Sequence, residues 1–272
     1  MAHRRTAVII TTYNRPDALA AVLEGYLAQA GAPFELIVAD DGSTVDTGDV
    51  IKRYAARAPF PLRHVWQEDR GFRAAAVRNR ALASTTAEYI IFTDGDCIPR
   101  RDFVARHCAL AEPGCFLAGN RVLLSEDFTR KALTEHLPLH DWNMLQWLTV
   151  RLTGGINRWL PLLGLPDGVW RTSAPQRWEG AKTCNLSAWR ADLARINGLD
   201  ESYSGWGLED SDLVIRLLHA GVRHKNARFA APVLHLWHRE NDRSRLPENQ
   251  RRLDKLLASS RIEAQSGLSQ YT

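Results

Sequence analysis

Two aspartates separated by one glycine, Asp94 and Asp96, follow a run of large apolar residues, 89–92, after a single threonine. Such a run is typical of a strand buried on both faces of a sheet, so we expect the acids where that strand ends. Carboxylates held this close repel each other, and a divalent cation with oxygen ligands would relieve the repulsion. An Asp-Gly-Asp turn in solvent is the alternative interpretation, and the motif alone does not decide between the two.

The amino-terminal part of the chain alternates between strand-like and helix-like segments. Strands are expected at 6–12, 34–39, 62–66 and from 89, and helices at about 16–27, 45–58, 72–83 and 101–111. This alternation predicts an α/β fold with a mostly parallel central sheet flanked by helices. Polar clusters at 11–15, 40–43 and 94–96 then fall at the carboxyl ends of strands, where α/β proteins bind ligands. We expect these clusters to converge on one crevice, which favours a functional site over a solvent turn.

A second group of acids, which includes Glu209 and Asp210, opens an apolar helical pattern that ends before Gly221. Acids in a first helical turn commonly cap the helix and offset its dipole. The glycines on either side of Trp206 indicate a further role, because glycine allows tight turns and the close approach of a ligand.

The apolar run 229–237 contains His235 and is followed by His238. A lone histidine is more often a packing or surface residue than a ligand, so this pair alone is weak support for a metal site. Farther on, the pattern at 247–257 predicts a basic amphipathic helix. Residues 258–272 are expected to form a loose tail.

The composition is that of a soluble globular protein, with 272 residues, 45% hydrophobic and 24% charged. The net charge of +4 comes mainly from arginine and is compatible with nucleic acid, an anionic membrane surface or phosphorylated ligands. The four cysteines form neither a CxxC pair nor a disulfide framework, and the basic start lacks a signal-peptide core. Both features favour a cytoplasmic location. No apolar run approaches the roughly 18 residues that a membrane-spanning helix needs.

Residues 121–178 interrupt the alternation of strands and helices. Five of the nine tryptophans lie there: Trp142, Trp147, Trp159, Trp170 and Trp178. Three interpretations stay open: an insert that binds an acceptor, a patch that rests on a membrane interface, or a subcore of packed tryptophans. Stacking of aromatic faces on the C–H surfaces of sugars makes the first of these attractive.

Taken together, the motifs resemble family 2 glycosyltransferases of the GT-A fold. The matching segments are TTYNR at 11–15, ADDGS at 39–43, DRGFR through AVRN at 69–79, and TDGD at 93–96. GWGLED at 205–210, followed by His235 and His238, is similar to the carboxy-terminal module of galactosyltransferases, which chondroitin-polymerase-type bacterial transferases also carry. The resemblance covers about 6–120 and 178–240, and the order and spacing of the motifs are more specific than any one motif.

The resemblance implies a single GT-A catalytic domain over 1–272. Within it we expect a nucleotide-sugar-binding half (1–120), the tryptophan-rich insert (121–178), an acceptor-binding and catalytic half (179–240), and a basic carboxy-terminal helix and tail (241–272).

The resemblance also implies residue roles. Asp96 and His238 would hold a metal ion, Mn²⁺ or Mg²⁺, with His235 a less certain ligand. Asp210 would be the general base, Glu209 its catalytic neighbour and Trp206 an acceptor-binding residue. The residues matching the nucleotide-sugar site are Thr11, Tyr13, Asn14, Arg15, Asp40, which would face the uracil, Arg78, Asp94 and Gly95.

The implied reaction is an inverting, metal-dependent transfer of a sugar from a UDP-sugar to a hydroxyl of a glycan or lipid-linked acceptor. A carboxylate roughly 4 Å from a phosphate oxygen costs about 4 kcal/mol at an effective dielectric constant of about 20, so a bridging cation is needed beside Asp94 and Asp96. Oxygen ligands with one imidazole fit Mn²⁺ somewhat better than Mg²⁺. Polysaccharide biosynthesis in the cytoplasm is the expected setting, and peripheral contact with the inner membrane face stays open.

Three rival functions are weighed against this one. A nucleic-acid-binding protein would use the arginine surplus, but the arginines are dispersed and no binding motif occurs, so no nucleic-acid partner is expected. A metal-dependent nucleotidyltransferase also places acids at strand ends, and it would release pyrophosphate instead of a nucleoside diphosphate. A catalytically silent carbohydrate-binding relative is disfavoured by the intact set of Asp96, Asp210 and His238.

Overall fold

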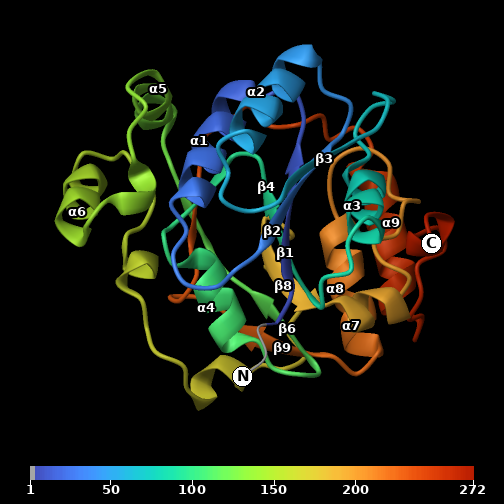
Figure 1. The fold of residues 1–272 in the computed structure, drawn as a ribbon. Helices are drawn as coiled ribbons and strands as arrows, with labels where there is room; N and C mark the ends of the chain where they lie inside the picture. The colour runs from blue at the N-terminus through green and yellow to red at the C-terminus, as the bar shows by residue number, and fades with distance from the viewer. Residues whose placement is uncertain (1–3) are drawn as a thin grey trace.

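The protein is built on one seven-stranded sheet with the strand order β3-β2-β1-β4-β8-β6-β9 (Figure 1). A computed structural model describes residues 4–272. The strands are β1 (Thr6–Thr12), β2 (Glu35–Asp40), β3 (Leu62–Trp66), β4 (Tyr89–Asp94), β6 (Cys115–Ala118), β8 (Asn185–Trp189) and β9 (Arg223–Asn226). β8 runs antiparallel to both of its neighbours, and the other four pairings in this sheet are parallel. The prediction of a mostly parallel sheet is confirmed.

Helices cover both faces of this sheet (Figure 1). One layer contains α1 (Pro16–Leu27), α2 (Val45–Ala55) and α4 (Phe103–Leu110), and the other contains α3 (Ala74–Ala83), α7 (Arg190–Arg195) and α8 (Glu209–His219). Alternate residues of β1 pack against the two helix layers: Val8 and Ile10 against the first, and Ala7 and Ile9 against the second. Because both faces are buried, the strand reads as an unbroken apolar run.

The elements predicted for the amino-terminal part agree with the structure to within a few residues. The strand expected at 34–39 lies at 35–40, and the helices expected at 45–58, 72–83 and 101–111 lie at 45–55, 74–83 and 103–110. The helix expected from 72 begins later because Arg73, with φ of −134°, still has non-helical backbone geometry.

A second, three-stranded sheet adjoins the end of β4. It consists of β5 (Cys97–Pro99), β10 (Val233–His235) and β7 (Arg121–Leu123), with β10 in the middle. β5 follows Asp96 directly, and its first residue, Cys97, pairs with His235 of β10. This pairing places His235, which lies far along the chain, close to the end of β4.

The insert contains two α-helices, α5 (Glu126–Thr134) and α6 (Met144–Leu152), and the short 3₁₀ turns η1 (Leu139–Asp141), η2 (Leu160–Leu163) and η3 (Val169–Thr172). Trp147 is fully buried, and its ring centroid lies 5.1 Å from that of Trp142 and 6.4 Å from that of Phe128. These contacts support the subcore interpretation for the first two tryptophans. Within residues 4–272, no helix combines the length and the apolar character needed to cross a bilayer.

The carboxy-terminal segment packs against the body of the protein. α9 (Leu246–Leu257) buries Leu253 and Leu256 beside Ile215 of α8, as an amphipathic helix should. The prediction of a loose tail over 258–272 is wrong, because Ala264 and Leu268 are buried and the tail ends in the 3₁₀ turn η4 (Leu268–Gln270).

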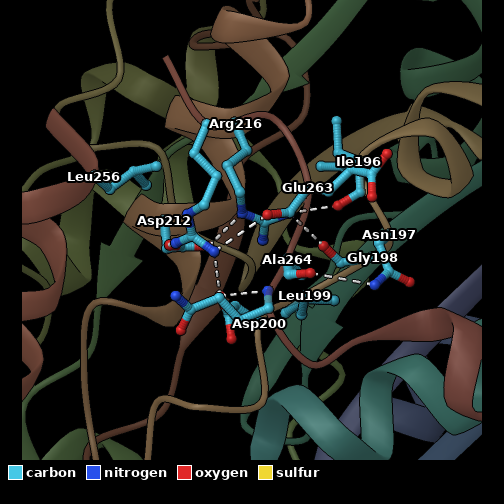
Figure 2. Close-up of polar contacts among 12 residues, drawn as sticks. Ile196, Asn197, Gly198, Leu199, Asp200, Asp212, Arg216, Leu256, Glu263 and Ala264 are labelled. Carbon is cyan, nitrogen blue, oxygen red and sulfur yellow. Dashed lines mark hydrogen bonds and ion pairs between the residues drawn. The ribbon is translucent and has the colours of Figure 1, made fainter. Parts of the chain in front are cut away.

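A buried ion-pair network anchors this tail. The Arg261 guanidinium donates to Asp200 at 2.8 Å and to Asp212 at 3.2 Å, and both carboxylates are fully buried. Arg216 donates to the other oxygen of Asp212 at 2.5 Å and to the carbonyl oxygens of Ile196 and Gly198 (Figure 2). Because buried carboxylates are stable only with charged or hydrogen-bonding partners, Arg261 holds the tail in place.

We expect Arg261→Met to lower the free energy of unfolding by about 3 kcal/mol, because the buried carboxylates of Asp200 and Asp212 both lose a cation. The control is Arg251→Met, which removes an exposed arginine of α9 that has no ion pair within residues 4–272 and should change stability by less than about 0.5 kcal/mol. Urea denaturation of both variants makes the comparison, and equal midpoints would contradict the anchoring role.

Candidate active site

A large cavity of about 1060 Å³ opens at the carboxyl ends of β1 and β4, beside the small sheet. Its wall includes residues from each of the segments in which the sequence predicted functional groups: 11–15, Asp41 of the turn 40–43, 94–96, 206–210, and His235 with His238. The predicted convergence of the three clusters at 11–15, 40–43 and 94–96 on one crevice therefore occurs, although Asp40 itself does not line the cavity. It follows from the register of the sheet, in which Thr11 pairs with Asp94 on the neighbouring parallel strand.

Arg78 of α3 ties three parts of the cavity wall together. Its guanidinium donates to Thr11 Oγ1 at 2.8 Å, to Asp94 Oδ1 at 2.9 Å and to Glu209 Oε1 at 3.3 Å, and its side chain is only 4% exposed. Burial alone would lower the pKa of Arg78, but the charges of Asp94, Glu209 and Asp210 outweigh it and raise the pKa. The guanidinium therefore stays charged and links the ends of β1 and β4 to the start of α8.

Glu209 is an acid of the cavity with a strongly raised pKa. Burial and the neighbouring charge of Asp210 raise its pKa to about 7, although Arg78 acts in the opposite direction. Its second oxygen, Oε2, is buried and has no hydrogen-bond partner within residues 4–272. Glu209 thus changes charge near neutral pH, whereas carboxylates in water ionise well below it.

Asp96, His235 and His238 form a group with the chemistry of a metal site. Their potential ligand atoms all lie within 4.8 Å of one another. Asp96 Oδ1 is 3.8 Å from His235 Nε2, and Asp96 Oδ2 is 3.4 Å from His238 Nε2. His238 Nδ1 donates to the carbonyl oxygen of Arg239 at 2.7 Å, which leaves the Nε2 of a neutral imidazole with a lone pair facing the carboxylate.

Two lone-pair donors that face each other in this way fit a cation between them, and a hydrogen bond behind the imidazole is the usual support for a metal-bound histidine. The donor set of one carboxylate and two imidazoles suits Mn²⁺ and other divalent ions of intermediate hardness. The structure therefore brings His235, the less certain ligand of the sequence analysis, into the same group as Asp96 and His238.

Asp210 also lines the cavity, in the first turn of α8. Its Oδ1 accepts a hydrogen bond from Lys182 Nζ at 3.3 Å and from the backbone N–H of Ser211 at 2.8 Å. Within residues 4–272, Oδ2 has no hydrogen-bond partner. The backbone turn before the helix has positive φ at Gly205, Gly207 and Leu208, which accounts for the glycines around Trp206. Trp206 itself lines the cavity.

The remaining predicted residues lie directly after β1 and β4. Tyr13 donates to Asp69 at 2.9 Å, the Asn14 backbone N–H donates to Ser43, and Arg15 pairs with Asp17; all three predicted residues line the cavity. Gly95 donates its N–H to the carbonyl oxygen of Thr11. These hydrogen bonds and this ion pair, all within the chain, hold the polar residues of the cavity rim in place.

Asp40 is the predicted site residue that does not line the cavity. Its carboxylate is buried in the turn, where it accepts the backbone N–H of Ser43 at 2.8 Å and contacts His64 Nε2 at 3.0 Å. Burial would raise the pKa of Asp40, but the hydrogen bonds from His64 and Ser43 outweigh it and lower the pKa. The next residue, Asp41, reaches the cavity wall instead, held by Gln67 and the backbone N–H of Arg73.

Lys182 and Arg121 are cavity residues that the sequence analysis did not single out. Lys182 precedes β8 and meets Asp210 across 28 positions in the sequence. Neither residue belongs to a recognisable motif. Only the pairing of distant strands brings them to the site.

The order of the strands and the acid-lined cavity at their carboxyl ends agree with the GT-A fold that the sequence motifs predict. The model described as glycosyl transferase family 2 matches residues 7–162, and the chain belongs to that family. A second model, described as the N-terminal domain of galactosyltransferase, matches residues 171–239, the region in which the sequence indicated a galactosyltransferase module.

Curated relatives agree with this assignment. The chain is 32% identical over 226 residues to validoxylamine A glucosyltransferase of Streptomyces hygroscopicus subsp. limoneus, an alignment that covers 79% of this chain and 48% of that protein. It is 29% identical over 229 residues to hyaluronan synthase of Pasteurella multocida, covering 80% of this chain and 23% of the synthase. The chain thus spans about half the length of the first relative and less of the second.

Solved structures show the same fold. The mannosyltransferase PcManGT from Pyrobaculum calidifontis, in complex with GDP-Man and Mn²⁺, superposes with a TM-score of 0.61 at 21% identity, over 88% of this chain and 59% of that one. TarS residues 1–349 of S. aureus, in complex with UDP, gives a TM-score of 0.61 at 15% identity, over 98% of this chain and 68% of that one. The expected GT-A fold is confirmed.

Proposed function

We propose that the chain is an inverting, metal-dependent glycosyltransferase that moves a sugar from a UDP-sugar to a hydroxyl of a glycan or lipid-linked acceptor. The observation that carries the proposal is the geometry of Asp210. One carboxylate oxygen is held by Lys182 and the Ser211 N–H, while the other has no partner within residues 4–272, on the wall of the cavity that also contains Asp94 and Asp96. A carboxylate fixed through one oxygen and open at the other is suited to take a proton from an acceptor hydroxyl.

In the proposed reaction, Asp210 accepts the proton of the acceptor hydroxyl while that oxygen attacks the anomeric carbon. The bond from this carbon to the diphosphate breaks on the opposite face, so the configuration inverts. Trp206 would position the acceptor, because it lies on the cavity wall four residues before the base. Lys182 orients Asp210 through their 3.3 Å contact, and Glu209 stays bound to Arg78.

On the donor side, Asp96, His238 and His235 would hold Mn²⁺ or Mg²⁺, which when bound offsets the charge of the leaving diphosphate. Arg78 keeps Asp94 in place at the end of β4. Thr11, Tyr13, Asn14, Arg15 and Gly95 form the wall on which the nucleotide would lie. For Asp40 the contacts favour an indirect role, because a bond to uracil requires its carboxylate to leave Ser43 and His64.

The names of related proteins support a nucleotide-sugar donor. The TarS structures contain UDP or UDP-GlcNAc, and the PcManGT structure contains GDP-Man with Mn²⁺. The match to family 2 glycosyltransferases favours sugar transfer over nucleotidyl transfer, and the retained acids disfavour a silent carbohydrate-binding relative. A nucleotidyltransferase would release pyrophosphate, so identification of the released product separates the two reactions.

Peripheral contact with an anionic membrane is part of this proposal, through α6. Leu145 and Leu152, seven residues apart and therefore on one helical face, are 72% and 79% exposed. The stretch 142–166 contains Arg151 and Arg158 but no carboxylate. Exposed leucines beside unopposed arginines suit a surface of anionic lipid.

Asp210→Asn should lower turnover by roughly a hundred- to ten-thousand-fold, because the amide cannot accept the proton. UDP binding should stay close to that of the wild type, since Asp210 lies on the acceptor side. The measurement is UDP release from a panel of UDP-sugars with Mn²⁺, beside calorimetric titration with UDP. Asp254→Asn, at an exposed position of α9, is the control. Near-normal turnover of Asp210→Asn would remove Asp210 as the base.

Asp96→Asn and His238→Gln should each weaken Mn²⁺ binding in the presence of UDP by at least about tenfold, because each removes a metal ligand. Free Mn²⁺, followed by electron paramagnetic resonance during a titration, gives the affinity without any need for turnover. His136→Asn, which replaces an exposed histidine outside the cavity, should bind like the wild type. Unchanged affinity in both site variants would contradict the proposed metal group.

The wild-type chain should float with phosphatidylglycerol vesicles and stay unbound with phosphatidylcholine vesicles. Leu145→Ser combined with Leu152→Ser should lower the partition coefficient by about tenfold, because two leucines lose their burial in the lipid interface. Leu257→Ser, at an exposed leucine of α9, is the control and should bind normally. Equal flotation of the double variant and the wild type would rule out α6 as the contact.

A further inference from the structure

Arg121 is the first residue of β7, and strand alternation turns it toward the cavity. Arg121 and Leu123 line the cavity wall, whereas Val122 between them is fully buried in the core. β7 pairs in parallel with β10, so that Leu123 lies opposite His235 of the metal group and Arg121 lies opposite Val233. Arg121 therefore lies two residues along β7 from Leu123, the residue that pairs with the predicted metal ligand His235.

The guanidinium of Arg121 has no ionic partner within residues 4–272, unlike most of the other cations of the cavity wall. Within residues 4–272 it forms neither a side-chain hydrogen bond nor a salt bridge, although the residue is half-buried. The partnered cations on the wall are Arg15 with Asp17, Arg78 with Asp94 and Glu209, Arg130 with Glu126 and Asp127, Lys182 with Asp210, and Arg243 with Glu240. Arg239 also lacks one in this part of the chain, but it is exposed to water.

Arg121 is charged in this environment. Burial would lower its pKa, but the thiols of Cys184 and Cys97 and the carboxylates of Asp94 and Asp96 outweigh burial and raise the pKa. A half-buried cation without a direct partner loses hydration that no hydrogen bond within the described chain replaces. Such a group is best explained by a ligand that completes its contacts.

The side chain and its surroundings indicate the chemistry of that ligand. Arginine presents a planar fork of N–H donors that matches a phosphate or carboxylate through two parallel hydrogen bonds. A neutral sugar hydroxyl does not need such a group. The acids Asp94 and Asp96 on the same wall repel any anion, so an anionic ligand here needs a cation besides the proposed metal ion.

From this placement we infer that Arg121 binds an anionic group of the donor, and this inference rests on the proposed transfer from a nucleotide sugar. Two parts of a donor carry that chemistry: the diphosphate, which every nucleotide sugar contains, and a carboxylate on the transferred sugar, which only a uronic acid donor contains. If Arg121 binds the diphosphate, it contributes to the affinity for every nucleotide-sugar donor. If it binds a sugar carboxylate, it contributes to the selection of the transferred sugar.

The test is calorimetric binding of UDP, UDP-glucose and UDP-glucuronate, each with Mn²⁺, to the wild type and to Arg121→Gln. If Arg121 contacts the diphosphate, the substitution weakens all three ligands alike, by roughly ten- to a hundredfold, the loss expected for a hydrogen bond to a charged group. If it contacts a sugar carboxylate, only UDP-glucuronate weakens by that factor. Binding of all three within twofold of the wild type overturns the inference.

Arg130→Gln is the matched control, because it removes one positive charge from the same cavity wall at a residue that already has carboxylate partners. It should bind all three ligands as the wild type does, and a loss equal to that of Arg121→Gln would reduce the effect to net charge and overturn the inference. Thermal melting checks folding. If Arg121→Gln melts early, Arg121→Lys, which keeps the charge but not the fork, should still lose affinity by about threefold or more, and wild-type affinity in Arg121→Lys overturns the inference.

Failure of the inference and failure of the proposed function give different results. A wild-type chain that binds neither UDP nor either UDP-sugar contradicts the proposed function. Normal binding by the wild type together with unchanged binding by the Arg121 variants contradicts the role of Arg121 alone.

Discussion

The buried guanidinium of Arg78 is the interaction on which the site depends. It joins Thr11 at the end of β1, Asp94 at the end of β4 and Glu209 at the start of α8, which lies 131 positions away in the sequence. Without a cation among them, two half-buried or buried acids could not stay this close, because each would lose hydration and repel the other. The same side chain therefore fixes the docking of α8 on the sheet and the shape of the cavity.

The carboxyl groups of the cavity outnumber the cations that contact them. Asp94, Asp96, Glu209 and Asp210 bring four carboxyl groups, whereas Arg78 and Lys182 are the cations that contact them directly. Glu209, with a pKa of about 7, is partly neutral at physiological pH, which relieves the excess near Arg78. The remaining unopposed charge lies on Asp96, beside two imidazoles that can share a cation. Asp210 contacts Lys182 through one oxygen and leaves the other open to the cavity, so in the proposed mechanism metal binding and proton transfer fall to different acids.

Much of this arrangement could be predicted from the sequence because its signals are local. The apolar runs at 6–12 and 89–92, with helical periodicity between them, are sufficient to predict parallel strands whose ends meet. The antiparallel β8, the pairing of β10 with β5 and the anchoring of the tail by Arg261 could not be predicted in this way. Each joins residues that are 49 or more positions apart, and such pairing leaves no periodic pattern in the chain. For the same reason, no pattern in the sequence predicts that Lys182 and Arg121 line the cavity, where they are placed by the packing of distant segments.

Gly95 shows how closely the local chain and the site are coupled. β4 ends at Asp94 and β5 begins at Cys97, so the direction of the chain must change within two residues, and the Gly95 N–H holds this turn by donating to Thr11. A Cβ at position 95 would lie 2.8 Å from Thr12 Oγ1 and 2.9 Å from Thr12 Cβ, closer than real Cβ contacts come. A side chain there would push the turn away from β1 and move both acids with it. The glycine between the two aspartates is therefore a packing requirement, and it allows Asp94 to reach Arg78 while Asp96 faces the histidines of the second sheet.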